Sequence, residues 1–241
     1  MKKLLSLILA GSMLFSLAAC GGSSESKDDA VNTDSPNDVV NNGSASGEDS
    51  SVEIGDYIKF GKYEQDNDLS NGKEDIEWVV LDEQDGKLLV ISRYELDSQV
   101  YHETNQFIDV TWETCTLRSW LNNNFYNEAF TKEEQNSIQT TTVIAEDNPT
   151  YETDAGDDTQ DKLFLLSISE VKNYIVTDAA KYCWGTEYAE ALGATGWWWL
   201  RTPGKSQSTA ATVTMAGEII YYGNNIFTTG NGVRPAMWIE L

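Results

Sequence analysis

Residues 76–92 read IEWVVLDEQDGKLLVIS, and this stretch decides how the folded part of the chain begins. Two runs rich in β-branched and aromatic residues, Ile76–Asp82 and Lys87–Ser92, flank the pair Asp85-Gly86. Asp and Gly tolerate the positive φ angles of a two-residue hairpin turn, so this pair between apolar runs is a strong hairpin signal. The sequence therefore predicts two antiparallel strands here.

The residues downstream of the hairpin predict short helices. Apolar side chains at helical spacing predict a helix over residues 117–125, with Thr114 or Thr116 as its N-cap. Thr131 and Ser167 are each followed three residues later by Glu, which is the spacing of a capping box. We therefore expect two further helices to begin at these positions.

Extended segments surround the helices. Strands are expected over 54–60, 140–145 and 163–166 and in several stretches after residue 197, and one more helical turn is expected over 186–192. Strands, then helices, then strands favour an α+β fold with a mixed or antiparallel twisted sheet, two or three short helices and a long irregular C-terminal region.

The first twenty residues, MKKLLSLILAGSMLFSLAAC, are typical of an export signal. Two lysines and an apolar run, shorter than the ~20 residues of a membrane-spanning helix, precede Leu17-Ala18-Ala19-Cys20. This ending resembles the lipobox of bacterial lipoproteins. The resemblance implies that residues 1–19 are removed and that Cys20 carries acyl chains, which anchor the chain outside the cytoplasm at the cell membrane or outer surface. An ordinary secretory signal with an incidental Cys is the alternative.

A polar spacer follows the signal. Residues 20–52 contain no aromatic residue, and seven acidic residues stand against Lys27 alone. Such a segment buries too little apolar surface to offset its ordering entropy, so we expect a disordered linker with a reach of roughly 30 Å. The composition changes at Glu53, and residues 53–241 are expected to form one domain.

The composition excludes several classes of function. The chain has 241 residues, with 39 Asp+Glu against 16 Lys+Arg and a formal net charge of −23. Binding to phosphates requires clustered Lys and Arg, so no nucleic-acid partner is expected. His102 is the single His, and with three Cys it does not supply an ordinary zinc site or a marked catalytic nucleophile. Export permits a disulfide between Cys115 and Cys183, which the sequence leaves open.

Several segments together resemble a family of uncharacterised bacterial domains, domain of unknown function 6273. They occur in order across nearly all of residues 53–241: Gly55–Gly61, Glu77–Leu81, Ser119–Asn122 with Phe125-Tyr126, Asp161–Ser167, Trp198–Gly204 and Gly232–Trp238. The resemblance implies a fold and scarcely a function.

The C-terminal layout is also similar to the C-type-lectin-like fold. This similarity implies that the first and last strands pair, Ile54–Phe60 with Val233–Ile239. It also implies that the irregular region between about Asp178 and Gly232 is the ligand face. The scaffold hosts many functions, so the likeness does not choose among them.

Aromatic residues in this region are the candidate ligand-binding residues. Alternation along a strand places Trp197 and Trp199 on one face and Trp198 on the other. One face belongs to the core, and the other is either buried as well or an aromatic platform for sugar rings or aliphatic chains. The candidate residues of that platform are Trp184, Tyr188, Trp197, Trp198, Arg201, Tyr221 and Tyr222.

Two arginines lie in apolar contexts, Arg201 in WLRTP and Arg234 in GVRPA. A buried guanidinium requires partners, so a structural ion pair is expected for each, and the anchoring of an anionic ligand is the alternative. Together with Trp238 they are expected to be structural residues.

An acidic loop over residues 146–161 offers the candidate metal ligands. Oxygen ligands separated by small residues suit Ca²⁺, and a merely solvated loop is the alternative. The candidate Ca²⁺ ligands are Asp147, Asp154, Asp157, Asp158 and Asp161. No other cofactor is expected.

The combined pattern favours a lipid-anchored, non-catalytic binding or sensing module for a glycan, a peptide or another envelope component. A cell-envelope hydrolase using Asp or Glu residues of the same domain is the first alternative, and a structural envelope protein is the second. A hydrolase requires a polar cleft with carboxylates of shifted pKa, whereas a binder requires a shallow aromatic-lined face.

Overall fold

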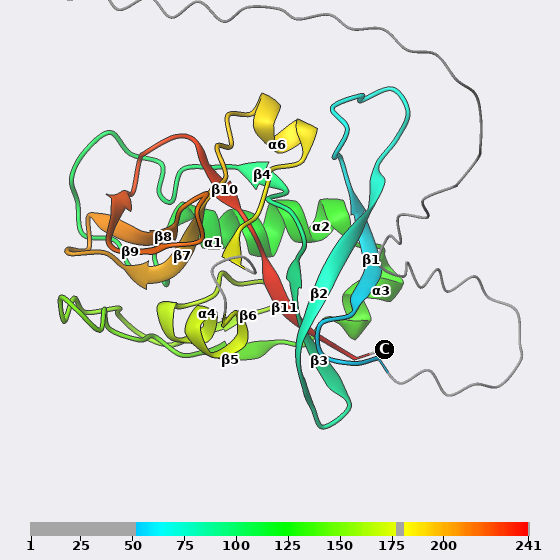
Figure 1. Ribbon diagram of the computed structural model, residues 1–241, viewed down its shortest axis with the longest axis horizontal. Helices are drawn as coiled ribbons and strands as arrows, with labels where there is room; N and C mark the ends of the chain where they lie inside the picture. The colour runs from blue at the N-terminus through cyan, green and yellow to red at the C-terminus, as the bar shows by residue number, and fades with distance from the viewer. Residues whose placement is uncertain (1–51, 177–180, 241) are drawn as a thin grey trace, which may run out of the picture. The chain divides into compact units, whose positions relative to one another are not determined.

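The hairpin expected at residues 76–92 is confirmed in the computed structural model (Figure 1). Strand β2, Glu74–Gln84, pairs antiparallel with strand β3, Lys87–Ser92. Between them, Asp85 and Gly86 have φ angles of 52° and 75°. Both angles are positive, as a two-residue turn matched to the strand twist requires.

The structure describes residues 52–176 and 181–240. The predicted leader, the lipidation site Cys20 and the linker apart from Val52 lie outside these residues. Within the described ranges, no helix has both the length and the apolar character needed to cross a membrane.

The first sheet has the strand order β1-β2-β3-β11 and is antiparallel throughout. Strand β1 spans Tyr57–Tyr63 and strand β11 spans Ala236–Glu240. The predicted pairing of Ile54–Phe60 with Val233–Ile239 is wrong, because β1 pairs with β2 and β11 pairs with β3. The hairpin lies between the two terminal strands and leaves them at opposite edges of the sheet.

The second sheet has the order β4-β10-β7-β8-β9, in which β10 runs parallel to β7 and the other neighbours are antiparallel. A separate pair joins β5 to β6. The bounds of these strands are Asp97–Ser98 (β4), Thr141–Val143 (β5), Thr159–Asp161 (β6), Trp197–Pro203 (β7), Thr209–Val213 (β8), Ile219–Asn225 (β9) and Asn231–Val233 (β10).

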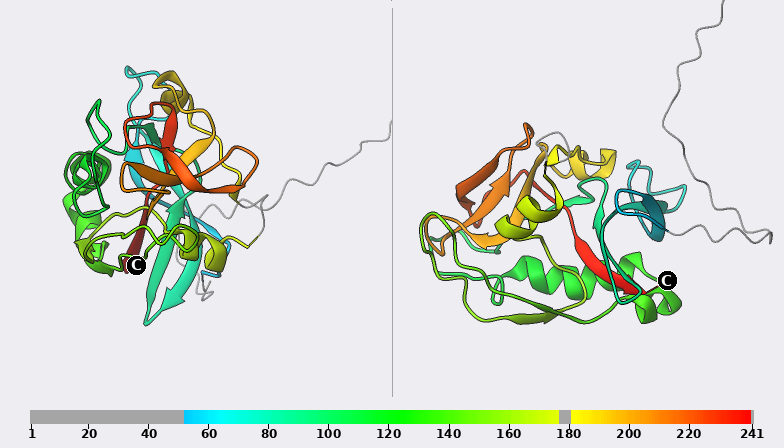
Figure 2. Two further views of the ribbon diagram at one scale, coloured as in Figure 1. Left: turned by 90° about the vertical axis from the view of Figure 1, so that its left-hand side faces the viewer. Right: turned by 60° about the horizontal axis from the view of Figure 1, so that its bottom comes forward.

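The chain passes directly from the second sheet to the first at its C-terminal end. Only Arg234 and Pro235 separate β10 from β11, so the last strands of the two sheets are almost continuous. The red ribbon of β11 can be followed between the two sheets in Figures 1 and 2. Mainly antiparallel sheets with short helices confirm the α+β class.

The predicted helix over 117–125 is the start of a longer helical segment. It begins as α1, widens into the π-helix η1 and continues as α2. The other helices are short and lie where expected. The bounds are Thr116–Trp120 (α1), Leu121–Phe125 (η1), Tyr126–Ala129 (α2), Lys132–Ser137 (α3), Ile168–Tyr174 (α4) and Glu187–Ala191 (α6).

The caps of these helices test the local predictions. The capping boxes at Thr131 and Ser167 are confirmed, each with its Glu bonded back to the cap backbone. The predicted cap of α1 is wrong, because Cys115 Sγ accepts the hydrogen bond from the Arg118 backbone N–H at 3.3 Å. Thr114 instead bonds to Thr111 and contributes to the turn that precedes the helix.

The strand expected over 163–166 is also wrong, although the segment is buried. It makes one isolated bridge, Phe164 with Ala236 of β11, and is otherwise irregular. Its amides find other partners, since Asn122 Oδ1 accepts from the Leu163 N–H at 3.1 Å. Side-chain and distant backbone partners satisfy the segment, so it needs no neighbouring strand.

The hydrophobic core extends on both sides of β7. Trp198 and Trp199 project to opposite faces of this strand, and both have no exposed surface. Trp78 of β2 is equally buried and donates its indole N–H to the Phe60 carbonyl at 2.7 Å. Both faces of the second sheet are therefore covered near β7.

A buried ion pair joins β7 to α4. The Arg201 guanidinium is 5% exposed and binds both carboxylate oxygens of Glu170, with 2.8 Å from Nη2 to Oε1. Arg201 also donates to the Leu165 carbonyl at 2.8 Å and to the Ile144 carbonyl at 3.3 Å. One side chain thus holds together the sheet, the helix and the two irregular segments that precede the helix.

Replacing Glu170 with Ala is expected to lower the free energy of unfolding by about 3–5 kcal/mol, because Arg201 then stays buried without its counter-ion. Urea unfolding followed by circular dichroism measures this loss. Glu133→Ala in the first turn of α3 is the matched control, since Glu133 is exposed, and it is expected to change stability by under about 1 kcal/mol. Equal losses in the two variants would contradict the role given to the ion pair.

Candidate functional site

A short parallel bridge between two distant segments builds the candidate site. Glu95 and Gly185 form the bridge, in which the Glu95 N–H donates to the Trp184 carbonyl at 3.0 Å and the Thr186 N–H donates to the Glu95 carbonyl at 3.0 Å. Side chains alternate along extended backbone, and the Glu95 side chain is buried. Tyr94 and Trp184, one residue earlier on each segment, therefore share the outer face.

The outer face carries exposed aromatic rings. Trp184 is 53% exposed, and the ring of Tyr182 meets it edge-on with 5.2 Å between centroids. Tyr94 is half-buried and lies under the Arg93 guanidinium at 5.1 Å. Exposed Trp side chains are rare in folded proteins, so this group is the distinctive apolar feature of the face.

A shallow hollow of about 230 Å³ lies beside these rings. It is lined by Gln65, Asp66, Tyr94, Gly185, Thr186 and Glu187. Its two walls are the β1–β2 loop and the start of α6, which lie side by side in Figure 1. The Tyr188 N–H donates to the Gln65 carbonyl at 3.0 Å and ties the walls together.

The electrostatic character of the hollow is acidic. Asp66 and Glu187 contribute carboxylates, and the nearest polar neighbours are amide and hydroxyl groups. Hydrogen bonds from the Asn71 side chain and the Asp68 backbone lower the pKa of Asp66, so this group stays ionised. A general acid requires the opposite shift, and the hollow therefore suits the binding of hydroxyl-rich or cationic groups.

Two buried carboxyl groups lie beneath the hollow. Burial raises the pKa of Glu95 to about 8, and the Arg234 guanidinium opposes this shift. Burial also raises the pKa of Asp97, which accepts hydrogen bonds from Tyr63 at 2.7 Å and from Gln99 at 2.9 Å. Neither carboxyl is exposed, so both support the site from within.

The structure divides the residues predicted for the aromatic platform. Trp184 and Tyr188 lie at the hollow, but Tyr221 and Tyr222 lie on β9, at the opposite edge of the second sheet from β4. Trp198 is fully buried and donates its indole N–H to the Lys181 carbonyl at 3.2 Å.

The seven candidate residues therefore do not share one exposed surface. Trp197 is only half-buried at the start of β7, whereas Arg201 lies in the core with Glu170. The alternation along β7 was predicted from the sequence. Its second face is buried because other segments of the chain cover it.

The acidic loop uses most of its carboxylates for its own backbone. Asp147 accepts from the Ala155 N–H at 2.9 Å, Asp154 from the Gly156 N–H at 2.8 Å, and Asp158 from the Ala145 N–H at 2.7 Å. Such bonds stabilise turns in a solvated loop.

The remaining two candidates of this loop differ in burial. Asp161 is buried and accepts from Arg118 at 2.7 Å and from Trp112 at 2.9 Å, whereas Asp157 is exposed. Among the described residues, the three carboxylates whose oxygens gather within 4.8 Å belong to another loop. A Ca²⁺ site in the acidic loop stays a prediction without a gathered ligand set.

The other residues that the sequence singled out are structural in their surroundings. Arg234 donates to the Ser92 carbonyl at 2.8 Å and stacks over the Trp198 ring at 5.1 Å. Cys115 and Cys183 are buried, free thiols. Trp238 is half-buried in β11, and its carbonyl accepts from the Gln139 N–H at 2.8 Å.

His102 is half-buried, and its ring accepts a hydrogen bond rather than facing a nucleophile. Its Nδ1 accepts from the Thr116 N–H at 3.3 Å. This geometry supports the start of α1.

Sequence reasoning missed most of the hollow. Gln65, Asp66, Tyr94 and Glu187 belong to no motif that the sequence analysis identifies. The alternating acids Glu64, Asp66 and Asp68 were an available signal, because alternate oxygen ligands in a loop are typical of cation sites.

Comparison with known proteins gives one match. A family model described as a domain of unknown function (DUF6273) matches residues 85–241. No curated protein and no solved structure matches the chain.

Glu95→Gln is expected to change the pH dependence of stability. The Glu95 carboxyl ionises near 4.5 when unfolded and near 8 when folded, so its stabilising contribution is complete below about pH 4.5 and is lost as the pH rises through 8. The variant should match the native chain at pH 4.5 and be more stable at pH 9, since it removes a slope of up to about 1.4 kcal/mol per pH unit.

Chemical unfolding at several pH values measures this difference. Glu218→Gln, at an exposed position, is the control and should not change the slope. A Glu95→Gln variant that is destabilised equally at both pH values would show that the buried carboxyl is ionised in the folded chain.

Proposed function

The chain belongs to the DUF6273 family, and we propose that it is a lipid-anchored, extracytoplasmic binding module that recognises a neutral glycan of the cell envelope. The proposed ligand site is the hollow beside Trp184, together with the aromatic face formed by Tyr94, Tyr182 and Trp184. No bond is made or broken in this function.

The exposed Trp184 ring is the observation that carries the proposal. Trp184 keeps 53% of its surface exposed, and the hollow lined by Gln65, Asp66 and Glu187 begins at the next residue. A sugar presents apolar C–H groups on one face and hydroxyls around its rim. Aromatic rings pack against the C–H groups, and carboxylate and amide groups form hydrogen bonds with the hydroxyls.

The charge of the chain favours a neutral ligand over an anionic one. The formal net charge is −23, and the hollow itself contributes Asp66 and Glu187. Like charges repel over about 10 Å at moderate ionic strength, so polyanions are disfavoured. Neither of the predicted anion anchors is available, because Arg201 and Arg234 are buried.

The chemistry of the carboxylates favours binding over hydrolysis. Glycosidases require one carboxyl with a raised pKa next to the scissile bond. The carboxyls near the site whose pKa is raised, Glu64, Glu95 and Asp97, are all buried. The pKa of Asp66, which lines the hollow, is lowered. A purely structural protein would have little use for an exposed Trp beside a hollow.

The anchor is part of the proposal. Residues 1–19 and the Cys20 lipobox imply acylation, and two or more acyl chains are needed for stable attachment. The polar linker over 20–52 would hold the domain at a distance from the membrane, which suits a chain of this negative charge because anionic lipids repel it.

We also propose a distant likeness to the C-type-lectin-like fold. The first and last strands belong to one four-stranded sheet, and α6 together with the chain leading into it forms the proposed ligand face. The terminal strands are separated by the hairpin, so any likeness lies in the layout of the sheets and of the ligand region rather than in strand pairing.

Trp184→Ala is expected to weaken glycan binding at least tenfold, because it removes the ring against which the sugar stacks. An array of neutral glycans, anionic glycans and peptidoglycan fragments identifies the ligand, and titration calorimetry measures Kd. Tyr222→Ala is the matched control, since Tyr222 is 50% exposed at the distant edge of the second sheet, and its Kd should stay within twofold. Binding of anionic glycans alone, or equal losses in the two variants, would contradict the proposal.

Cys20→Ala is expected to release the chain from the membrane fraction, because it removes the acylated thiol. The native chain should have the mass of residues 20–241 plus its acyl groups, measured by intact-mass spectrometry. Ser24→Ala in the same linker is the control and should leave both mass shift and fractionation unchanged. Recovery of native chain that still contains residues 1–19 in the cytosol would rule out the anchor.

A further inference from the structure

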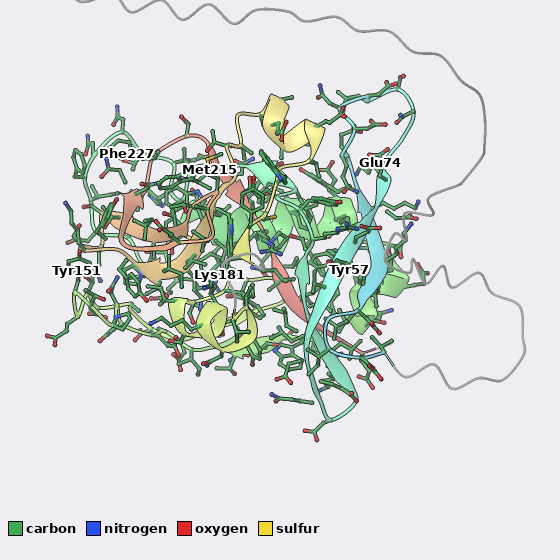
Figure 3. All side chains as sticks on the ribbon, viewed as in Figure 1. Tyr57, Glu74, Tyr151, Lys181, Met215 and Phe227 are labelled. Atoms are coloured by element: carbon green, nitrogen blue, oxygen red, sulfur yellow. The ribbon has the colours of Figure 1, made fainter. Side chains whose placement is uncertain are left out.

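The β1–β2 loop brings three carboxylates together at the foot of the candidate site. Strand β1 ends at Tyr63, which pairs with Glu74 at the start of β2. Glu64 and Asp66 follow Tyr63 in the loop and Glu74 lies at the loop's other end, so the strand pairing brings the two ends of the loop together. Figure 3 shows Glu74 at the foot of this long loop.

The spacing of these carboxylates matches the coordination sphere of one cation. One oxygen each from Glu64, Asp66 and Glu74 lies within 4.8 Å of the other two. Ca²⁺ binds oxygen at 2.3–2.6 Å, so two oxygens on the same ion are at most about 5 Å apart. The three side chains therefore reach a common centre without rearrangement of the backbone.

The buried oxygen of Glu64 is a second observation, independent of the spacing, that points to a bound cation. Glu64 is 5% exposed, and no residue that the structure describes donates a hydrogen bond to its Oε1. An unpartnered buried carboxylate oxygen is costly, and here it belongs to the same side chain that joins the cluster.

The basic residues of the loop do not neutralise the cluster. Lys62 pairs with Asp75 at 2.6 Å, and Lys73 pairs with Glu128 at 3.2 Å. The three carboxylates therefore bring up to three negative charges together while the adjacent lysines are engaged elsewhere. Mutual repulsion in this geometry destabilises the loop unless protons or a cation are bound.

Hydrogen bonds already hold two of the carboxylates in position. Asp66 accepts from the Asp68 N–H at 2.8 Å and from the Asn71 side chain at 2.7 Å, and Glu74 Oε2 accepts from the Gln65 N–H at 2.7 Å. Each of these oxygens retains a second lone pair. The ligands are thus oriented in advance, which reduces the ordering that an ion must impose.

We propose that Glu64, Asp66 and Glu74 bind a Ca²⁺ ion that fixes the β1–β2 loop. All three ligands are carboxylate oxygens, which select a hard cation, and the flexible geometry of Ca²⁺ suits an exposed loop better than the strict octahedron of Mg²⁺. Water completes the coordination on the exposed side. The affinity expected for such a site is that of extracellular modules, with a Kd of about 10⁻⁴–10⁻³ M.

The ion would also order one wall of the hollow. Gln65 and Asp66 line that wall, and the Gln65 carbonyl accepts the bond from Tyr188 of α6. The cation site is argued from the loop alone and does not depend on the identity of the glycan. Its test therefore measures the ion directly.

Calorimetric titration of the purified chain with CaCl₂, after removal of cations with EDTA, tests the site. One bound ion is expected, and at about ten times Kd the unfolding temperature should rise by about 3–6 °C over its value in EDTA. Glu64→Gln and Glu74→Gln should each raise Kd for Ca²⁺ at least tenfold. MgCl₂ is expected to bind at least tenfold more weakly than CaCl₂.

Stability in EDTA separates loss of ligands from loss of folding. Glu64→Gln should be as stable as the native chain in EDTA, or more stable, because it removes repulsion within the cluster. The double variant Asp157→Asn, Asp158→Asn in the acidic loop is the matched control and should keep the native Kd. No Ca²⁺ binding at about 10 mM, or loss of binding in the acidic-loop variant alone, would overturn the proposal.

Discussion

The arrangement of the domain depends on one buried guanidinium. Arg201 lies on β7, and its charge is balanced by Glu170 of α4 and by the carbonyls of two irregular segments. Because a buried cation tolerates few positions of its partners, this pair fixes the helix against the second sheet. It also orders the segment from Leu163 to Leu166, which bridges to β11 and hence to the first sheet.

A second buried guanidinium, that of Arg234, links the core to the candidate site. Arg234 lies where the chain crosses between sheets, with Ser92 and Trp198 as its contacts. Burial raises the pKa of Glu95, and the Arg234 guanidinium opposes this shift. The backbone of Glu95 in turn holds the segment that presents Trp184. The exposed aromatic face is therefore supported by polar groups that are themselves buried and constrained.

The acidic character of the whole chain is also found at the aromatic face, where carboxylates line the hollow. The formal net charge of the chain is −23, and Asp66 and Glu187 bring carboxylates into the hollow, which suits the neutral ligand that we propose. Asp66 also belongs to the cluster with Glu64 and Glu74, in which one carboxylate oxygen of each residue lies within 4.8 Å of the others. The two proposed ligands suit the same negatively charged surface. A neutral glycan is not repelled by the carboxylates, and a divalent cation reduces the repulsion between them.

The sequence by itself determined the features that depend on a few neighbouring residues. The hairpin at Asp85-Gly86 and the capping boxes at Thr131 and Ser167 follow from local backbone preferences. Trp184 was a candidate because it is an aromatic residue in the irregular C-terminal region. Only the tertiary structure decided which strands are neighbours and which side chains share a surface. Those outcomes depend on contacts between residues far apart in the chain, such as Glu95 with Gly185, and no local preference encodes them.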